Sequence, residues 1–338
     1  MERSSPKPEK EDIYPAAEAV IVAIVGRGKH PDTILYKICQ PLGRKIMSTE
    51  TLIYEKENFA EGSVVTLTMN KPETLNVLNI EFSREIDDAL TRVEQDDDVK
   101  VVVIKASGKA FSAGYDLGRV YFVYGGGTGK KEEKTRRPSQ RSRLAYDRWR
   151  SESLRRIFLL DKITIAQVHG YCIGGGLYMS LCCDMTIAAE DAKIGHSEQR
   201  LGFAGAMYVF PIEVMLIGQK KARELLLTGK LIDGQEAERI GLVNYAVPAD
   251  KLEAETRKLA QSMTLLPRDG IAIGKATARL AYDAMGMSSA FGQGYLGHTM
   301  FTNLRYEPGE FNFLKRRRDV GVREAVKERD ARYKGLID

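Results

Sequence analysis

The sequence predicts an α/β fold with parallel strands, and two observations carry that prediction. Short apolar runs of the length typical of buried strands alternate with longer helical patterns along the 338-residue chain. Two of these runs, 101–105 and 163–168, each lead into a glycine-rich turn. Repeated strand–helix–strand units of this kind indicate parallel strands that are joined by helices.

The elements follow in chain order, beginning with an expected hairpin. Apolar and polar residues alternate from 53 to 69, with a turn at 60–62. A helix is predicted over 81–94, because its apolar residues recur on one helical face. Asp233 is expected to cap a short helix before a final strand. The other predicted helices cover 141–160, 211–218, 220–228, 249–262, 269–285 and 310–333.

The composition is that of an ordinary globular protein and excludes several classes. Hydrophobic residues make up 43% and charged residues 29%, and the net charge of +5 is mild. No apolar run reaches the roughly 18 residues of a membrane span, so no membrane partner is expected. The four cysteines show neither disulfide nor zinc spacing, which indicates a reducing compartment. We therefore expect a cytoplasmic protein without a metal ion.

The stretch 163–205 contains the strongest signal for a binding site. An apolar run ends near Gly170, and Gly174, Gly175 and Gly176 then open a helical pattern. A strand that ends in glycines at a helix start leaves backbone N–H groups unpaired, and the helix dipole adds partial positive charge there. Such a place suits an oxyanion better than a metal ion, although three glycines alone are also typical of a tight turn.

A second glycine turn makes the oxyanion interpretation the stronger one. GKAFSAGYDL, residues 108–117, follows the buried run 101–105. Two such turns, far apart in the sequence, can each direct one N–H at the same point, which is how a thioester carbonyl is polarised as it becomes an enolate. Here the sequence resembles the crotonase (enoyl-CoA hydratase/isomerase) superfamily. GKAFSAGYDL matches its first oxyanion motif, and HGYCIGGG with the CDMTIAAEDAKIG run matches its second.

The resemblance assigns roles to particular residues. It implies that the backbone N–H groups of Tyr115 and Gly175 are the oxyanion donors. It also implies that the carbonyls of Ala113 and Leu117 contact the adenine of coenzyme A. KPETLNVLN, residues 71–79, resembles the family's first coenzyme A loop.

Further substrate contacts are expected from Leu75 in that loop, from Gly174 and from Tyr146. Tyr146 lies on the predicted helix 141–160, which would place it near the acyl pocket. The basic segment 118–150 is longer than its counterpart in the family. We interpret it either as a lid over the acyl end of the substrate or as a solvated surface loop.

The acid–base residues differ from the family's pattern. The family's two hydratase glutamates fall on Tyr178 and Glu198, so this chain keeps one carboxylate and has tyrosine in place of the other. Glu198 is expected to carry a proton to or from carbon. Tyr178 is a poor base, because free phenol titrates near pH 10, but it could pack in the core, donate a hydrogen bond or narrow the pocket. His196 is a minor candidate.

Three regions are expected along the chain. Residues 1–46 differ in character from the rest and are interpreted as an N-terminal appendage that is partly disordered. The resemblance begins at Met47, and it implies a crotonase-like spiral of ββα units over 47–265. It implies a C-terminal helical trimerisation region over 266–338, and therefore a homotrimer or a hexamer.

The resemblance implies an enzyme that acts on an acyl-CoA thioester, with coenzyme A as part of the substrate and no separate cofactor. One carboxylate suffices for a 1,3-proton shift, so a double-bond isomerase is the simpler fit. A hydratase with Tyr178 orienting the water stays open, as do hydrolytic C–C cleavage of a β-keto acyl-CoA and decarboxylation of a malonyl-type thioester. A non-catalytic RNA-binding protein of this fold is a different alternative. The basic clusters 134–143 and 315–318 lack interleaved aromatic residues, so no nucleic acid partner is expected.

Overall fold

Two sheets organise the protein. The computed structural model describes residues 37–39, 44–118, 139–202, 208–301 and 306–337, and within these ranges the larger sheet has eight strands. In spatial order they are β1 (Lys37–Cys39), β2 (Arg44–Ser48), β3 (Leu52–Phe59), β4 (Gly62–Met69), β5 (Val99–Ala106), β7 (Ile163–Val168), β9 (Met185–Ala189) and β12 (Tyr245–Val247). β1 to β4 pair antiparallel, and β4, β5, β7, β9 and β12 pair parallel.

A smaller sheet alternates with the larger one along the chain. Its strands are β11 (Leu231–Ile232), β10 (Lys193–Gly195), β8 (Tyr171–Ile173) and β6 (Ala110–Ser112). Each of β5, β7 and β9 is followed at once by a strand of this smaller sheet, namely β6, β8 and β10. This repeat confirms the predicted spiral. It also corrects the expectation that each apolar strand runs directly into its oxyanion turn, since a short second strand lies between.

Helices connect and cover the sheets. They are α1 (Ile80–Gln95), α3 (Gln140–Leu159), α4 (Gly175–Cys182), α5 (Phe210–Thr228), α6 (Gly234–Arg239), α7 (Leu252–Met263), α8 (Arg268–Ala284), α9 (Met287–Phe301), α10 (Phe313–Val320) and α11 (Val322–Ala331), with the 3-10 turns η1 (Pro72–Thr74) and η2 (Gln199–Leu201). α1 begins where the Asn79 side chain accepts the Phe82 N–H, and Asp233 caps α6 through the Glu236 N–H, as predicted.

Three segments depart from the expected boundaries. The predicted helix 310–333 is two helices, because Gly321 between α10 and α11 adopts φ 86° and ψ 165°, a conformation open almost only to glycine. Residues 44–46, assigned to the appendage, belong to β2 and pair with β3. Of the basic segment 118–150, residues 119–138 lie outside the described ranges, and 140–150 are the first half of α3.

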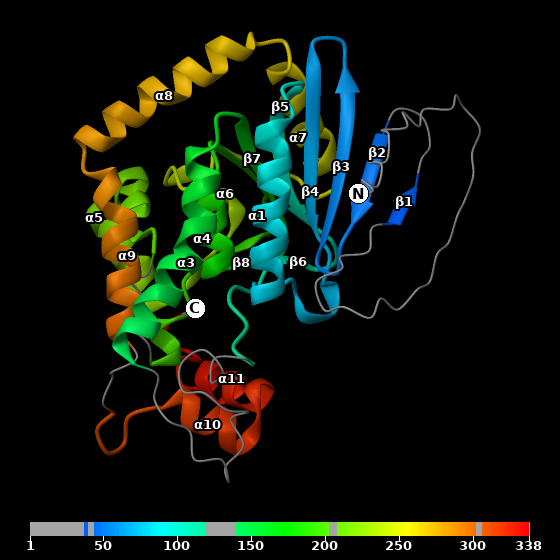
Figure 1. The fold of residues 1–338 in the computed structure, drawn as a ribbon. Coiled ribbons are helices and arrows are strands. Elements are labelled where there is room, and N and C mark those ends of the chain that lie inside the picture. Colours follow the sequence, from blue (N-terminus) through cyan, green and yellow to red (C-terminus); the bar gives the residue numbers. More distant parts are fainter. Residues whose placement is uncertain (1–36, 40–43, 119–138, 203–207, 302–305, 338) are drawn as a thin grey trace, which may run out of the picture.

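The C-terminal helices lie around the core. α9 packs against α3, whereas α8 runs along the outside of the molecule (Figure 1). α8 presents exposed apolar side chains, including Ile273 and Leu280. α10 and α11 lie together at one end. None of the described helices has both the length and the apolar character that a membrane crossing requires.

Replacing Gly321 by alanine tests whether backbone strain sets the break between α10 and α11. We expect Gly321→Ala to lower the free energy of unfolding by about 1–3 kcal/mol. A Cβ there meets no atom within 4 Å, so the loss would report the positive φ alone.

Gly274 is the matched control, because it is exposed inside α8 and its Cβ also meets nothing within 4 Å. Gly274→Ala should stabilise by about 0.5–1 kcal/mol. Urea unfolding measures both, and equal effects would contradict the explanation.

Candidate active site

The two predicted oxyanion turns meet in space. Gly114, which follows β6, adopts φ 88°, and a Cβ built on it would lie 2.7 Å from the Ile173 carbonyl oxygen and 3.3 Å from the Gly175 nitrogen. Gly176 is equally close to β6, since a Cβ there would lie 2.8 Å from that of Ser112. Glycine is therefore required at both positions to let the backbones approach.

This approach brings the two predicted N–H donors together. Tyr115 directly follows Gly114, and Gly175 is the first residue of α4. Among the described residues neither N–H has a hydrogen-bond acceptor. The Tyr115 ring covers Gly175, because a Cβ at Gly175 would lie 3.2 Å from its Cε2. The arrangement can hold an oxyanion between two backbone donors at a helix N-terminus.

The Glu198 carboxylate lies beside these donors. A Cβ at Gly174, whose φ is 54°, would lie 2.6 Å from Oε1 of Glu198, so the carboxylate contacts the residue that precedes Gly175. Oε1 accepts a hydrogen bond from the Tyr178 hydroxyl at 3.1 Å, and Oε2 accepts the Ser197 N–H at 2.8 Å. Both oxygens are thus held by donors, and the side chain has a defined orientation.

Tyr178 reaches Glu198 from the first turn of α4 and is fully buried. Burial, with the charge of Glu198 next in importance, raises the pKa of the Tyr178 phenol well above its ordinary value. The phenol therefore stays protonated and acts as a hydrogen-bond donor. Of the three roles considered for this residue, the structure shows core packing and hydrogen-bond donation together.

His196 lies behind Glu198 and is also buried. Its Nε2 contacts Oε2 of Glu213 on α5, and its Nδ1 lies 4.0 Å from Oε2 of Glu198. Burial by itself would lower the pKa of His196, but the hydrogen bond and charge of Glu213, with the charge of Glu198, raise it above the ordinary value. Glu213 was not singled out in the sequence, since a glutamate in the first turn of a helix has no distinctive spacing.

A strained tyrosine completes the aromatic surroundings. Tyr208 has φ 45°, which is uncommon for a residue other than glycine, and its side chain is buried. Its ring centroid lies 5.7 Å from that of Tyr115 and 6.3 Å from that of Tyr178. The Tyr208 ring also stacks on the His298 ring, with 4.8 Å between the two centroids. Strained backbone of this kind often accompanies functional sites.

α3 contributes a buried arginine that the sequence did not single out. The Arg150 guanidinium lies 4.3 Å from the centroid of the Tyr115 ring and donates to the Leu78 carbonyl at 3.0 Å. It also contacts the Tyr146 hydroxyl at 3.4 Å. Tyr146, which was expected to contact the substrate, therefore contacts Arg150. Tyr146 is not among the described residues that line the ligand cavity, which is described next.

A cavity of about 910 Å³ leads to the oxyanion turns. Leu75, Ala113 and Leu117, three of the five expected substrate-binding residues, line one side together with Tyr115, and α11 with the residues after it lines the other. The Leu75 carbonyl accepts the Ala113 N–H at 2.9 Å, which ties the η1 loop to β6. The Leu117 carbonyl, expected to contact adenine, accepts a hydrogen bond from Arg317 on α10. A ligand that bonds to this carbonyl must share the carbonyl with Arg317 or displace the Arg317 side chain.

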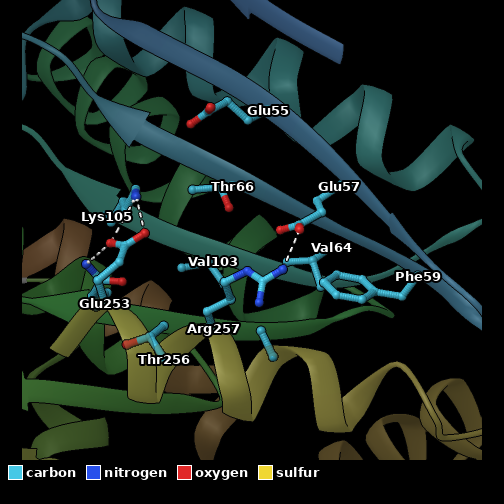
Figure 2. A pocket seen from close by; sticks show the side chains of 12 residues that line it. Glu55, Glu57, Phe59, Val64, Thr66, Val103, Lys105, Glu253, Thr256 and Arg257 are labelled. Carbon is cyan, nitrogen blue, oxygen red and sulfur yellow. Dashed lines mark hydrogen bonds and ion pairs between the residues drawn. The ribbon is translucent and has the colours of Figure 1, made fainter. Parts of the chain in front are cut away.

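A second hollow lies between α7 and the larger sheet, away from these turns (Figure 2). Its volume is about 70 Å³, and four of the five charged residues that line it form two ion pairs. Lys105 pairs with Glu253 at 2.8 Å, and Arg257 pairs with Glu57 at 2.6 Å. The larger cavity is lined by Tyr115, Ile173 and Ser197, which adjoin the two turns and Glu198, and it is therefore the candidate site. Gly174, Gly175 and Glu198 are not themselves among its described lining residues. No cluster of metal-binding side chains occurs in the described part of the chain.

Comparison with known proteins is consistent with this site. A family model described as enoyl-CoA hydratase/isomerase matches residues 60–318. The chain is 30% identical over 271 residues to the probable enoyl-CoA hydratase echA8 of Mycobacterium bovis, covering 80% of this chain and 97% of that protein. It is 32% identical to the crotonyl-CoA hydratase of Syntrophomonas wolfei, covering 69% and 82%. An enoyl-CoA hydratase/isomerase structure from Xanthobacter autotrophicus Py2 superposes with a TM-score of 0.71 at 29% identity, covering 84% and 98%.

The raised pKa of His196 predicts a pH dependence of stability. A raised folded-state pKa contributes stability that is fully present below the unfolded value of about 6.5 and is lost as pH rises through the folded value. We therefore expect the stability advantage of the wild type over Glu213→Gln to be largest below about pH 6.5 and to shrink above it. Urea unfolding at several pH values measures this difference.

Phe210→Leu is the control, because it alters an uncharged ring whose centroid lies 6.4 Å from that of His196. Its free energy of unfolding should change with pH in parallel with that of the wild type. An advantage that grows with pH would contradict the assignment.

Proposed function

The chain belongs to the enoyl-CoA hydratase/isomerase family of acyl-CoA enzymes, and from that premise we propose that it converts an acyl-CoA thioester through an enolate. In this proposal the N–H groups of Tyr115 and Gly175 bind the thioester oxygen. Glu198 is the group that moves the proton. The observation that carries the proposal is the contact of the Glu198 carboxylate with Gly174, directly before the Gly175 N–H. A carboxylate in that place lies beside the α carbon of a thioester whose oxygen occupies the turn.

The reaction that fits best is a shift of a double bond. Glu198 takes the proton from C2 of a 3-enoyl thioester, and negative charge builds on the thioester oxygen between the two N–H donors. The same carboxylic acid returns the proton to C4, so that the double bond moves to C2–C3. One carboxylate is sufficient for both transfers. Tyr178 supports this assignment, because its phenol is kept protonated and donates to Glu198 instead of accepting a proton.

Hydration of a 2-enoyl thioester is the second candidate. The names of the relatives favour it, since the Mycobacterium bovis and Syntrophomonas wolfei proteins are both named as hydratases. In that reaction both the Tyr178 hydroxyl and Glu198 would have to contact the attacking water, so their direct hydrogen bond of 3.1 Å would have to open to admit it. C–C hydrolysis and decarboxylation need the same enolate, so substrates for both belong in the assay panel.

The described lining of the cavity carries a small excess of positive charge. Arg200, Arg329 and Lys334 line it, and Asp116 and Asp330 are the acidic residues among the described lining. Arg329 is paired with Asp330 at 2.7 Å, so Arg200 and Lys334 are the cations that we expect to pair with the phosphates of coenzyme A, while the thioester reaches the glycine turns. The acyl-CoA substrate class is therefore supported by charge as well as by family.

The decisive variants are Glu198→Gln and Tyr178→Phe. Loss of the proton carrier should reduce kcat by about 10²–10⁴. Coenzyme A affinity, measured by calorimetry, should stay unchanged because the oxyanion donors are backbone groups.

Tyr178→Phe should cost an isomerase less than about tenfold, or roughly 1.4 kcal/mol, and a hydratase considerably more. A panel of 3-enoyl-, 2-enoyl-, β-keto- and malonyl-CoA thioesters identifies the reaction. Near-normal turnover by Glu198→Gln would reject the role given to this residue.

We also propose that the protein is a homotrimer or a hexamer. α8 exposes 65% of Ile273 and 71% of Leu280 on the outside of the molecule, a pair of large apolar side chains without cover in one chain. Light scattering at micromolar concentration should give three or six times the 37.8 kDa chain mass. Ile273→Lys with Leu280→Lys should shift the mass toward one chain, and Gly274→Ala on the same helix should not. A wild-type monomer would contradict this assembly.

A further inference from the structure

Three ionisable side chains form a buried row at the inner side of the candidate site. Glu213 on α5 and His196 after β10 have no exposed side-chain surface, and the Glu198 side chain is 11% exposed. Nε2 of His196 contacts Glu213, while its Nδ1 faces Glu198 at 4.0 Å. One imidazole thus lies between two carboxylates.

We propose that His196 and Glu213 are positioning residues, which hold a proton on the imidazole and thereby set the charge and orientation of the Glu198 carboxylate for proton transfer. The proposal rests on the proposed role of Glu198. It adds two residues that act only through Glu198.

The burial of Glu213 requires a positive partner. A carboxylate removed from water is strongly unfavourable unless it is paired, and the contact with Nε2 of His196 is the ion pair that the structure provides. Glu213 also lies in the first turn of α5, where the helix dipole favours an anion. The proton that neutralises the pair is therefore best placed on His196, as an imidazolium.

The second nitrogen of this imidazolium is directed to the catalytic carboxylate. Among the described residues Nδ1 of His196 has no hydrogen-bond partner, and Oε2 of Glu198 is the carboxylate oxygen that faces it. The groups around His196 are Glu213 from α5, Glu198 from its own segment, the protonated Tyr178 from α4, at 5.7 Å between rings, and the uncharged Phe210. Without that proton, a neutral His196 ring would lie between two carboxylates, one on each side.

This arrangement predicts a pH limit on turnover. With His196 protonated, Glu198 is attracted toward Nδ1 and held between Ser197 and Tyr178. Above the raised pKa of His196 that attraction disappears, and kcat/KM should fall. Glu213→Gln removes the hydrogen-bonded anion that keeps the proton in place. The fall should then begin at lower pH.

The experiment is the pH profile of kcat/KM for the wild type, Glu213→Gln, His196→Gln and Phe210→Leu, from about pH 5.5 to 9. In Glu213→Gln the high-pH fall should move down by about one pH unit or more, which is a tenfold loss at pH values between the two limits. His196→Gln should lack this fall altogether. Phe210→Leu, which changes packing without charge, should keep the wild-type position.

Parallel profiles, with a uniform loss at every pH, would overturn the proposal and leave a structural role only. If Glu213→Gln does not fold, His196→Gln decides, because a wild-type fall in that variant would equally reject the proposal. Failure of the proposed function is separate. It would appear as near-normal turnover by Glu198→Gln, whereas the pH dependence of unfolding would still report the buried pair.

Discussion

The close approach of two backbone turns is the constraint on which the site depends. Gly114 lies so near Ile173 and Gly175 that a single methyl group would separate them. β6 and β8 are neighbours in the smaller sheet, and this pairing holds the turns at the same level. The N–H groups of Tyr115 and Gly175 are positioned by this backbone geometry, and in the proposed function they are the donors to the thioester oxygen. The side chains decide which reaction follows.

The surrounding side chains place charge in an interior that would otherwise be apolar. Glu198 is accommodated because donors meet both of its oxygens, and Glu213 because an imidazole meets it. Each group would be costly without the next, so the row behaves as one unit. The strained backbone of Tyr208 lies against the same aromatic cluster. Strain and buried charge are both tolerated here because the larger sheet and its helices supply the stability.

The C-terminal helices help to enclose the cavity. α11 forms one wall, and Arg317 on α10 ties that wall to the Leu117 carbonyl on the opposite side. The break at Gly321 sets the angle between the two helices, so one backbone conformation affects the shape of the ligand cavity. Binding and the packing of this region are therefore expected to be coupled.

The sequence by itself determined the local elements and the two turns. Apolar periodicity located α1, β5 and β7, the glycines located the two turns, and the family resemblance assigned Tyr115, Gly175 and Glu198. Those signals are local, or are carried by motifs whose residues are contiguous. Only the tertiary structure decided that Tyr178 donates to Glu198, that Arg150 covers Tyr115 and that Glu213 pairs with His196. Each contact joins a residue at an ordinary helix position, namely Tyr178, Arg150 or Glu213, to a partner outside that helix. A glutamate in the first turn of α5 has the same local pattern whether it faces water or a buried imidazole, because the partner is supplied by a strand end distant in the chain.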